Sequence, residues 1–247
     1  MIHHASNLSK LSNISHGFFE CSSAEMPSLN CAFVEAESRP QVENQRDFMM
    51  TKMADKSLPL KTLKQIHSPT VHIVESADQV LPEGDGLVTD IPNLAIGILT
   101  ADCGPLLFSD PENKVIGAAH AGWRGAMSGV IESTISQMEK LGANRQNIIA
   151  ALGPTIAQES YEVGPEFEDL LGSNSTPLLK PAEKEDHFYF DLPGYIMLQL
   201  THSNIKNFEN LKLNTYTKNF FSRRKALHKS QHSQFRGLCN LSAIAIT

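Results

Sequence analysis

The stretch ILTADCGPLLFSDPENKVIGAAHAGWRG (98–125) decides the fold, because it joins apolar runs through short polar breaks. Uninterrupted apolar runs lie in or beside it at Leu94–Leu99, Leu106–Phe108 and Val115–Ala119. Continuous apolar runs of this length are typical of strands that are buried on both faces. Between the last two runs, DPEN (110–113) has the composition of a turn. The stretch therefore predicts neighbouring buried strands.

Beyond Gly122 the period of the apolar residues changes from that of a strand to that of a helix. One apolar stripe is formed by Met127, Val130, Ile131, Ile135, Met138 and Leu141. Gly142 follows the stripe, and glycine is a common residue at the end of a helix. This region therefore predicts an amphipathic helix that stops at Gly142.

Similar patterns predict further elements on both sides of this stretch. Strands are expected at 16–20, 28–34, 71–75, 147–152, 188–190, 212–217 and 242–246, with an extended segment at 58–67. The run GDGLVTD (84–90) is expected to be a glycine-rich turn that leads into a short strand. Helices are expected at 41–55, at 164–171 and after Asp191, which would cap the last one, and 172–186 reads as a loop. Because strands and helices alternate, we expect an α/β (α+β) fold, a single layered domain over residues 1–247 with mixed β-sheets flanked by helices.

The composition limits the classes of protein to consider. The chain has 247 residues, enough to bury a sizeable core, and its formal net charge of −6 argues against a nucleic-acid partner. Residues 1–20 do not resemble a secretory leader, and no apolar run is long enough to cross a membrane. The four cysteines show no CxxC spacing, which fits reduced thiols. We therefore expect a cytoplasmic protein.

Cys103 and His120 are the candidates for chemistry in the opening stretch. Cys103 stands in a TADCGP setting after a buried-strand pattern, and His120 ends an apolar run before AGWRG. Taken alone, each residue has a structural alternative, as a small buried thiol or as a hydrogen-bonded histidine. Taken together, a thiolate and an imidazole are ligands that zinc prefers. Asp102 is a candidate acid/base, or a partner of a metal-bound histidine.

His67, at the end of the extended segment 58–67, is a candidate third ligand. A catalytic zinc ion needs three protein ligands and one open position. The spacing alone does not join His67 to the other two residues, and His72 is a competitor within a strand pattern. Four arginines lie beside predicted loop or strand ends: Arg124, Arg223, Arg224 and Arg236. The alternatives for each are a phosphate-binding role and a solvated surface charge.

Four segments, read together, resemble the laccase-domain family, also called multicopper polyphenol oxidoreductases. They are TADCGPLLFSD (100–110), GAAHAGWRG (117–125), ALGPTIAQESYEVGPEF (151–167) and FDLPGY (190–195). The better-supported role of this family is that of zinc-dependent purine nucleoside phosphorylases that also deaminate adenosine. The resemblance runs from HGFF near the start to SAIAI near the end, and it implies a fold similar to that of cytotoxic necrotizing factor catalytic domains.

The resemblance also implies a set of site residues. His67, Cys103 and His120 match the family's Gln-x-His, ADC and HAGWRG motifs, which carry its metal ligands. Arg224 matches an arginine of the family's Phe-Phe-Ser-x-Arg segment, and we expect Arg46 and Arg224 to bind the phosphate. The implied cofactor is Zn²⁺, with copper as the alternative.

The chain departs from the family pattern in three segments. CSSAEM (21–26) lacks both glycines of the family's N-terminal loop. ENQ (43–45) replaces Glu-Asn-Arg and puts an arginine one position late, and GLCN (237–240) replaces a C-terminal Gly-Arg. These departures leave the three metal ligands in place and fall on segments expected to contact the nucleoside and the phosphate.

The expected reaction is phosphorolysis of adenosine, inosine or guanosine to the free base and ribose 1-phosphate, with deamination of adenosine as a second activity. For deamination, zinc would lower the pKa of its water toward neutrality and deliver hydroxide to C6 of adenine. The partners would be a small nucleoside and phosphate, with no nucleic acid and no membrane. The protein would act as a monomer or a homodimer.

Three other functions stay open at this point. A copper-dependent polyphenol oxidase needs many imidazoles, usually as His-x-His pairs, and this chain has ten histidines and no such pair. A metal-free cysteine hydrolase, such as an amidase on a peptidoglycan precursor, would use His120 to activate Cys103 as the nucleophile. A non-catalytic binding protein with the same fold is the third.

Overall fold

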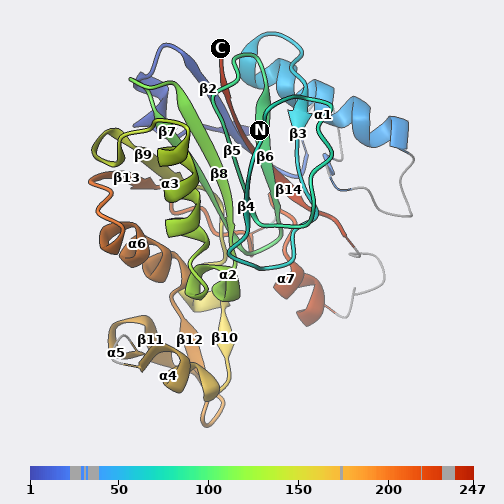
Figure 1. Cartoon of the computed structure of the whole chain (residues 1–247). Coiled ribbons are helices and arrows are strands. Elements are labelled where there is room, and N and C mark those ends of the chain that lie inside the picture. The colour runs from blue at the N-terminus through green and yellow to red at the C-terminus, as the bar shows by residue number, and fades with distance from the viewer. Residues whose placement is uncertain (23–28, 31, 33–38, 173–174, 218, 230–236) are drawn as a thin grey trace.

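Two β-sheets lie face to face, and helices cover their outer faces (Figure 1). This computed structural model describes residues 1–22, 29–30, 32, 39–172, 175–217, 219–229 and 237–247. The arrangement confirms the predicted layered α/β fold with mixed sheets flanked by helices. No helix among the described residues has the length and apolar character needed to span a membrane.

The larger sheet has six strands in the order β13-β9-β7-β8-β5-β4. They are β4 (Val71–Ile73), β5 (Gly86–Thr89), β7 (Gly104–Asp110), β8 (Val115–Ala121), β9 (Ile149–Leu152) and β13 (Asn207–Asn210). The two strands of the opening stretch, β7 and β8, form an antiparallel pair at its centre, with Leu106 opposite Ala119. Both are buried along their whole length, as their continuous apolar runs predict.

The second sheet has five strands in the order β1-β2-β14-β6-β3. They are β1 (Ile2–His3), β2 (Ile14–Phe19), β3 (Leu60–Lys61), β6 (Ala95–Thr100) and β14 (Asn240–Ile246). The C-terminal strand β14 lies between β2 and β6 and runs antiparallel to both. The last strand of the chain therefore lies between a strand from the N-terminal part of the chain and one from its middle.

Alternate side chains of the strands build three apolar layers. Between the sheets, residues of β2, β6 and β14 pack against residues of β7 and β8, as Phe18, Ile98 and Leu107 do. Helix α1 (Arg39–Ala54) covers the five-stranded sheet through Met49 and Met50. Helices α3 (Val130–Lys140) and α6 (Leu192–His202) cover the other face of the six-stranded sheet. The order of layers is therefore helix, sheet, sheet, helix.

A small third sheet extends from one end of these layers (Figure 1). Its strands are β10 (Glu162–Val163), β12 (Phe188–Phe190) and β11 (Leu179–Pro181), and helices α4 (Glu166–Leu171) and α5 (Ser175–Leu178) lie beside it. The prediction of a loop over 172–186 is therefore wrong. The polar composition of that segment hides two leucines, Leu178 and Leu179, which are buried and hold α5 and β11 in place.

Other predicted elements differ in extent. The helix after Gly122 is two helices, α2 (Trp123–Met127) and α3, because Gly129 between them has a φ of 95°, which interrupts the helical path. In the extended segment 58–67, only β3 pairs with a neighbour. The predicted strand at 212–217 is wrong, since Lys212 has a φ of 54° and the strand β13 ends before it.

The remaining elements are short. The strand predicted at 28–34 lies largely outside the described residues. A helix that the sequence analysis did not predict, α7 (Arg223–His228), follows Ser222, whose hydroxyl caps it by accepting a hydrogen bond from the Lys225 amide. The predicted cap of α6 is confirmed, since Asp191 accepts from the Gly194 amide at 2.8 Å. Short 3₁₀ turns lie at Leu8–Lys10, Arg145–Asn147 and Gln158–Ser160.

Candidate metal and substrate site

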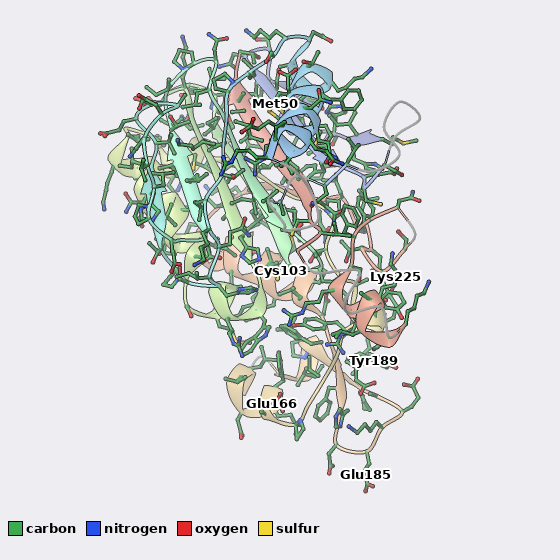
Figure 2. All side chains as sticks on the ribbon, turned by 90° about the vertical axis from the view of Figure 1, so that its right-hand side faces the viewer. Met50, Cys103, Glu166, Glu185, Tyr189 and Lys225 are labelled. Atoms are coloured by element: carbon green, nitrogen blue, oxygen red, sulfur yellow. The ribbon has the colours of Figure 1, made fainter. Side chains whose placement is uncertain are left out.

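His67, Cys103 and His120 meet at one end of the two facing sheets. His67 lies in the loop after β3, Cys103 lies between β6 and β7, and His120 lies near the end of β8. One ligand atom from each lies within 4.8 Å of the other two, and Sγ of Cys103 is 3.7 Å from Nε2 of His67. Figure 2 shows Cys103 near the ends of the long strands, on the side of the third sheet. The fold thus brings together three residues that spacing alone did not connect.

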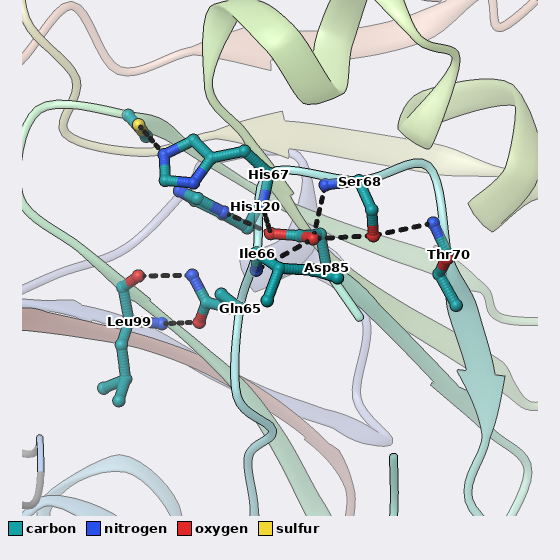
Figure 3. Close-up of polar contacts among 9 residues, drawn as sticks. Gln65, Ile66, His67, Ser68, Thr70, Asp85, Leu99 and His120 are labelled. Carbon is teal, nitrogen blue, oxygen red and sulfur yellow. Dashed lines mark hydrogen bonds and ion pairs between the residues drawn. The ribbon is translucent and has the colours of Figure 1, made fainter. Parts of the chain in front are cut away.

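The loop that carries His67 is held by a buried carboxylate, Asp85 (Figure 3). Asp85 accepts hydrogen bonds from the backbone amides of Ile66 at 3.2 Å, His67 at 2.9 Å and Ser68 at 2.6 Å. The Ser68 hydroxyl also donates to it, at 2.8 Å. His67 itself has a φ of 62°, so it does not continue the extended conformation predicted for 58–67; it lies on a tight turn that these bonds hold in place.

The same loop is tied to the five-stranded sheet by the side chain of Gln65. Its amide group donates to the carbonyl of Leu99 at 2.7 Å and accepts from the Leu99 amide at 2.9 Å. Figure 3 shows this two-bond pairing beside the Asp85 contacts. A side-chain amide thus supplies the pair of bonds that another strand would make.

Asp85 also orients His120. Nδ1 of the imidazole donates to Oδ1 of Asp85 at 2.7 Å, and both side chains are almost completely buried. A histidine whose Nδ1 is held by a carboxylate offers Nε2 to a metal ion. Asp85 is not among the site residues predicted from the sequence. Its signal is the GDG sequence (84–86), where an acidic residue stands between two glycines at the start of a buried strand.

The electrostatics of the cluster favour a charged thiolate. Burial raises the pKa of the Cys103 thiol, but the charge of His120 and hydrogen bonds from His120 and His67 outweigh it and lower this pKa to about 6. Burial lowers the pKa of His120, but the charge of Cys103 and the hydrogen bond that His120 donates to Asp85 outweigh it and raise this pKa to about 9. Without a metal, the two groups therefore form a thiolate–imidazolium pair at neutral pH.

Space for an ion beside these ligands depends on Gly122. A Cβ atom at this position would lie 2.8 Å from Sγ of Cys103 and 2.9 Å from Cδ2 of His67. A thiolate and two imidazoles are the donors that zinc prefers, and three protein ligands leave a position open. The residues present therefore fit a single zinc-like ion.

Two hollows open onto the cluster, and His67 and Cys103 line both. The larger hollow has a volume of about 600 Å³ and is lined in part by apolar side chains. Those side chains are Leu99, Ala226, Leu227 and Leu238. The divergent GLCN segment (237–240) contributes Gly237, Leu238 and Cys239 to it, so that departure from the family pattern falls on the wall of this hollow.

The second hollow, about 290 Å³ in volume, is lined by Arg124, Arg223 and Arg224, and we call it the arginine hollow. Two of these side chains stack on aromatic rings that line it as well. Cζ of Arg124 lies 4.8 Å from the ring centre of Trp123, and Cζ of Arg224 lies 5.3 Å from that of Tyr161. Stacked guanidinium groups are restrained and keep donors available for an anion.

The structure does not bring Arg46 to the cluster. Arg46 lies on α1 and lines a separate hollow that also contains Arg39, Lys61 and the acidic residues Glu43 and Asp47. Arg46 was expected to bind the phosphate because the ENQ segment shifts a family arginine by one position. Among the described residues that line the arginine hollow, the arginines come instead from α2 and α7.

Asp102 lies beside Cys103 and lines the arginine hollow. Its carboxylate accepts hydrogen bonds from the hydroxyl of Thr215 and from the backbone amide of Arg224, each at 2.7 Å. The sequence offered Asp102 as the partner of a metal-bound histidine. In the structure, the carboxylate that contacts a histidine of the cluster is that of Asp85 instead.

Comparisons with known proteins show which family the sequence resembles. The sequence profile of the family described as multi-copper polyphenol oxidoreductase laccase matches residues 15–236. A purine nucleoside phosphorylase of Rickettsia prowazekii is 33% identical over 221 residues, covering 87% of this chain and 85% of its own. One from Rickettsia conorii is 34% identical over 178 residues, covering 70% of this chain and 73% of its own.

A solved structure also matches nearly the whole fold. A Neisseria meningitidis protein of the DUF152 family superposes with a TM-score of 0.80 at 26% identity and covers 95% of both chains. The YlmD protein of Geobacillus stearothermophilus superposes with a TM-score of 0.81 at 23% identity, covering 98% of this chain and 94% of its own. The layered arrangement of the sheets is therefore shared with these proteins.

Proposed function

This chain belongs to the family described as multi-copper polyphenol oxidoreductase laccase, and on that premise we propose that it is a zinc-dependent purine nucleoside phosphorylase that also deaminates adenosine. The names of its relatives support the phosphorylase activity. The observation that carries the proposal is the position of the His67, Cys103 and His120 cluster between a large, partly apolar hollow and a hollow lined by three arginines.

The two hollows suit the two substrates of phosphorolysis. A volume of about 600 Å³ lies within the usual range of small-molecule sites, and an apolar lining suits the faces of a purine. Guanidinium groups bind phosphate through paired hydrogen bonds, so the arginine hollow suits the anion. Because both hollows share His67 and Cys103, the two substrates would meet beside the cluster.

In this reaction a phosphate oxygen forms a bond to C1′ of the ribose while the bond from C1′ to the purine breaks. The proton of the phosphate ends on the released base, and the sugar leaves as ribose 1-phosphate. The arginines would hold the phosphate in line with C1′, and the walls of the larger hollow would keep water away. Adenosine, inosine and guanosine share the bond that breaks, so each is a candidate substrate.

The donor set favours zinc. His67, Cys103 and His120 combine imidazole and thiolate, and the carboxylate of Asp85 holds one imidazole in the tautomer that a ligand needs. A bound zinc ion supplies a Lewis acid and lowers the pKa of water in its open position, which is the chemistry that deamination of adenine requires. Asp85, Ser68 and Gly122 act by holding the ligands and the space between them.

A copper oxidase is less well supported by the ligands. Among the described residues, one group of three or more histidine, cysteine, aspartate or glutamate side chains could hold a metal ion. It consists of His67, Cys103 and His120. A multicopper centre needs several ions with their own ligands. The described part of this chain therefore supplies ligands for one ion, whereas the family's descriptive name implies several copper ions.

A cysteine hydrolase is the second candidate, because the cluster also has the arrangement of a nucleophile, a base and an orienting acid. His120 stabilises the Cys103 thiolate, and Asp85 holds the far nitrogen of His120 at 2.7 Å. The thiolate would attack an amide carbonyl, release the amine and yield a thioester that water hydrolyses. An amide of a peptidoglycan precursor is the substrate class that would test this route.

One assay separates these functions. The protein is incubated with adenosine and phosphate, with and without a zinc chelator, and adenine, inosine and ribose 1-phosphate are measured. The proposal expects products that disappear with the chelator and return with zinc. Cys103→Ala should abolish metal binding and turnover together. Stoichiometric copper, or turnover that persists in metal-free protein, would contradict it, and amide cleavage by metal-free protein would favour the hydrolase.

A further inference from the structure

Asp102 is hydrogen-bonded to two separate segments of the chain beside the cluster, and we infer that it is a positioning residue that holds the arginines of α7 next to Cys103. The inference rests on the proposed function, in which the arginine hollow binds phosphate. It replaces the acid/base role that the sequence suggested for Asp102.

The carboxylate of Asp102 is held on both oxygens. Oδ1 accepts from the hydroxyl of Thr215 at 2.7 Å, and Oδ2 accepts from the amide of Arg224 at 2.7 Å. The Arg224 amide lies in the first turn of α7, where helix amides lack partners within the helix. Asp102 therefore fixes the start of α7 from outside the helix, in addition to the cap that Ser222 provides.

The backbone of Asp102 is held as well. Its carbonyl accepts from the hydroxyl of Thr155 at 2.9 Å and from the amide of Ile156 at 2.9 Å. Its φ is 96°, a left-handed conformation that a residue other than glycine keeps only when its surroundings impose it. Four hydrogen bonds from two distant segments supply those surroundings.

These contacts set the shape of the arginine hollow. The segment after β9 carries Ile156 and leads to Tyr161, on which Arg224 stacks. The segment after β13 reaches Thr215 and leads to α7 with Arg223 and Arg224. Asp102, directly before Cys103, is bonded to both segments. It thereby fixes the backbone at the start of α7, which carries Arg223 and Arg224, relative to Cys103.

The contacts of the Asp102 carboxylate favour a positioning role over proton transfer. A base must direct a free oxygen at the proton that it removes. Each oxygen of Asp102 accepts one hydrogen bond from a donor inside the protein, and one of these donors is a backbone amide that takes no part in proton transfer. Each oxygen keeps a second lone pair, so the substitutions below separate the two roles. Asparagine can keep both contacts, because its oxygen accepts from Arg224 and its amide group donates to the Thr215 hydroxyl.

Steady-state kinetics of the zinc-loaded protein test the inference with three variants. Asp102→Asn should leave kcat and the KM for phosphate within about twofold of the unchanged protein, since the contacts survive. Thr215→Val, which removes one of the two bonds to the carboxylate, should raise the KM for phosphate about five- to tenfold and leave the KM for adenosine unchanged. Asp102→Ala should raise the KM for phosphate further. Thr201→Val, which removes a hydroxyl on the exposed face of α6, is the matched control and should change neither.

An acid/base role predicts the opposite ranking. Asp102→Asn would then lower kcat by about 10²- to 10⁴-fold, as Asp102→Ala would, and Thr215→Val would leave the KM for phosphate unchanged. Either result overturns the inference. Thr215→Val keeps the test valid if Asp102→Ala fails to fold, because it leaves the backbone of residue 102 unaltered.

Hydrogen exchange gives a readout that does not depend on turnover. Deuterium uptake by peptides covering 220–228 should be faster in Asp102→Ala and in Thr215→Val, and unchanged in Asp102→Asn and Thr201→Val. Absence of phosphorolysis in the unchanged protein would defeat the proposed function and leave this measurement standing. Unchanged uptake in both Asp102→Ala and Thr215→Val would overturn the positioning role.

Discussion

Gly122 lies so close to Cys103 that a Cβ atom added at position 122 would stand 2.8 Å from the cysteine sulfur. The same atom would stand 2.9 Å from the ring of His67. Real Cβ atoms essentially never make such contacts, so Gly122→Ala must displace two ligands. We expect the affinity for zinc to fall about 10- to 100-fold, as it does when the surroundings of metal ligands are altered. Competition with a chromogenic chelator measures it.

Gly125→Ala is the matched control for this prediction. Gly125 belongs to the same HAGWRG motif, and a Cβ atom there would have its nearest neighbours, the carbonyl oxygens of His120 and Ser68, at 3.4 Å. This variant should bind zinc with unchanged affinity. Equal affinities of the Gly122→Ala variant and the unchanged protein would show that the space beside the sulfur is not needed.

Replacing Asp85 should weaken both the metal site and the fold. In Asp85→Ala, the imidazole of His120 and the amides of Ile66, His67 and Ser68 lose a buried acceptor. Loss of a buried charged partner with several donors costs about 3–5 kcal/mol of unfolding free energy. The affinity for zinc should fall about 10- to 100-fold in the same variant. Urea denaturation and chelator competition measure the two effects.

Asp85→Asn serves as the comparison, because the amide keeps the shape and one acceptor oxygen. It should retain more stability than Asp85→Ala. An Asp85→Ala variant that unfolds at the same urea concentration as the unchanged protein would be incompatible with the bonding described for this carboxylate.

The pH dependence of alkylation reports the charge on Cys103 in metal-free protein. A pKa lowered to about 6 means that the thiol is largely protonated below pH 6 and largely ionised above it. The rate of reaction with iodoacetamide should therefore rise as the pH increases through about 6, whereas an ordinary cysteine reacts with a midpoint of about 8.5. A Cys103→Ser sample corrects for the other thiols.

His120 provides the control for this titration. The charge of His120 and its hydrogen bond lower the pKa of Cys103, so His120→Asn should move the midpoint upward, toward that of an ordinary thiol. A midpoint that stays near pH 6 in that variant would assign the effect to another group.

The two arginines named from the sequence should behave differently. Arg224 lines the arginine hollow beside Cys103, and Arg46 lines a separate hollow. Arg224→Gln should raise the KM for phosphate at least about tenfold, because a charge-assisted hydrogen bond is lost. Arg46→Gln should change it less than about twofold if the phosphate binds where we propose. An equal effect of both substitutions would place the anion elsewhere.

Much of the fold could be predicted from local patterns. The apolar runs of β6, β7 and β8 are long enough to identify buried strands, and the cap of α6 follows from Asp191. The helix break at Gly129 and the buried pair Leu178 and Leu179 were missed. A single glycine or two leucines in a polar segment leave too weak a periodic signal, and tertiary packing decides their conformation.

The site residues also divide into those that local motifs identify and those that depend on contacts distant in sequence. The three residues of the proposed metal site were named from motifs, whereas Asp85 was not. Its role depends on the pairing of β5 with β8, which sets Gly86 opposite Ala119 and so brings Asp85 beside His120. The partners of Asp102, Thr215 and Arg224, lie even farther along the chain. Relations of this kind arise from the three-dimensional arrangement of the strands and have no local sequence pattern.

The bonds of Asp85 also bear on how the protein would acquire an ion at the proposed metal site. One carboxylate fixes the backbone of His67 and the ring of His120 through hydrogen bonds between protein groups. The ligands are therefore preorganised, and loading an ion costs little conformational entropy. Exchange of one ion for another would then need no refolding. Which metal occupies the site in a cell would follow from donor chemistry and supply, and a change of supply could change the chemistry that the same chain performs.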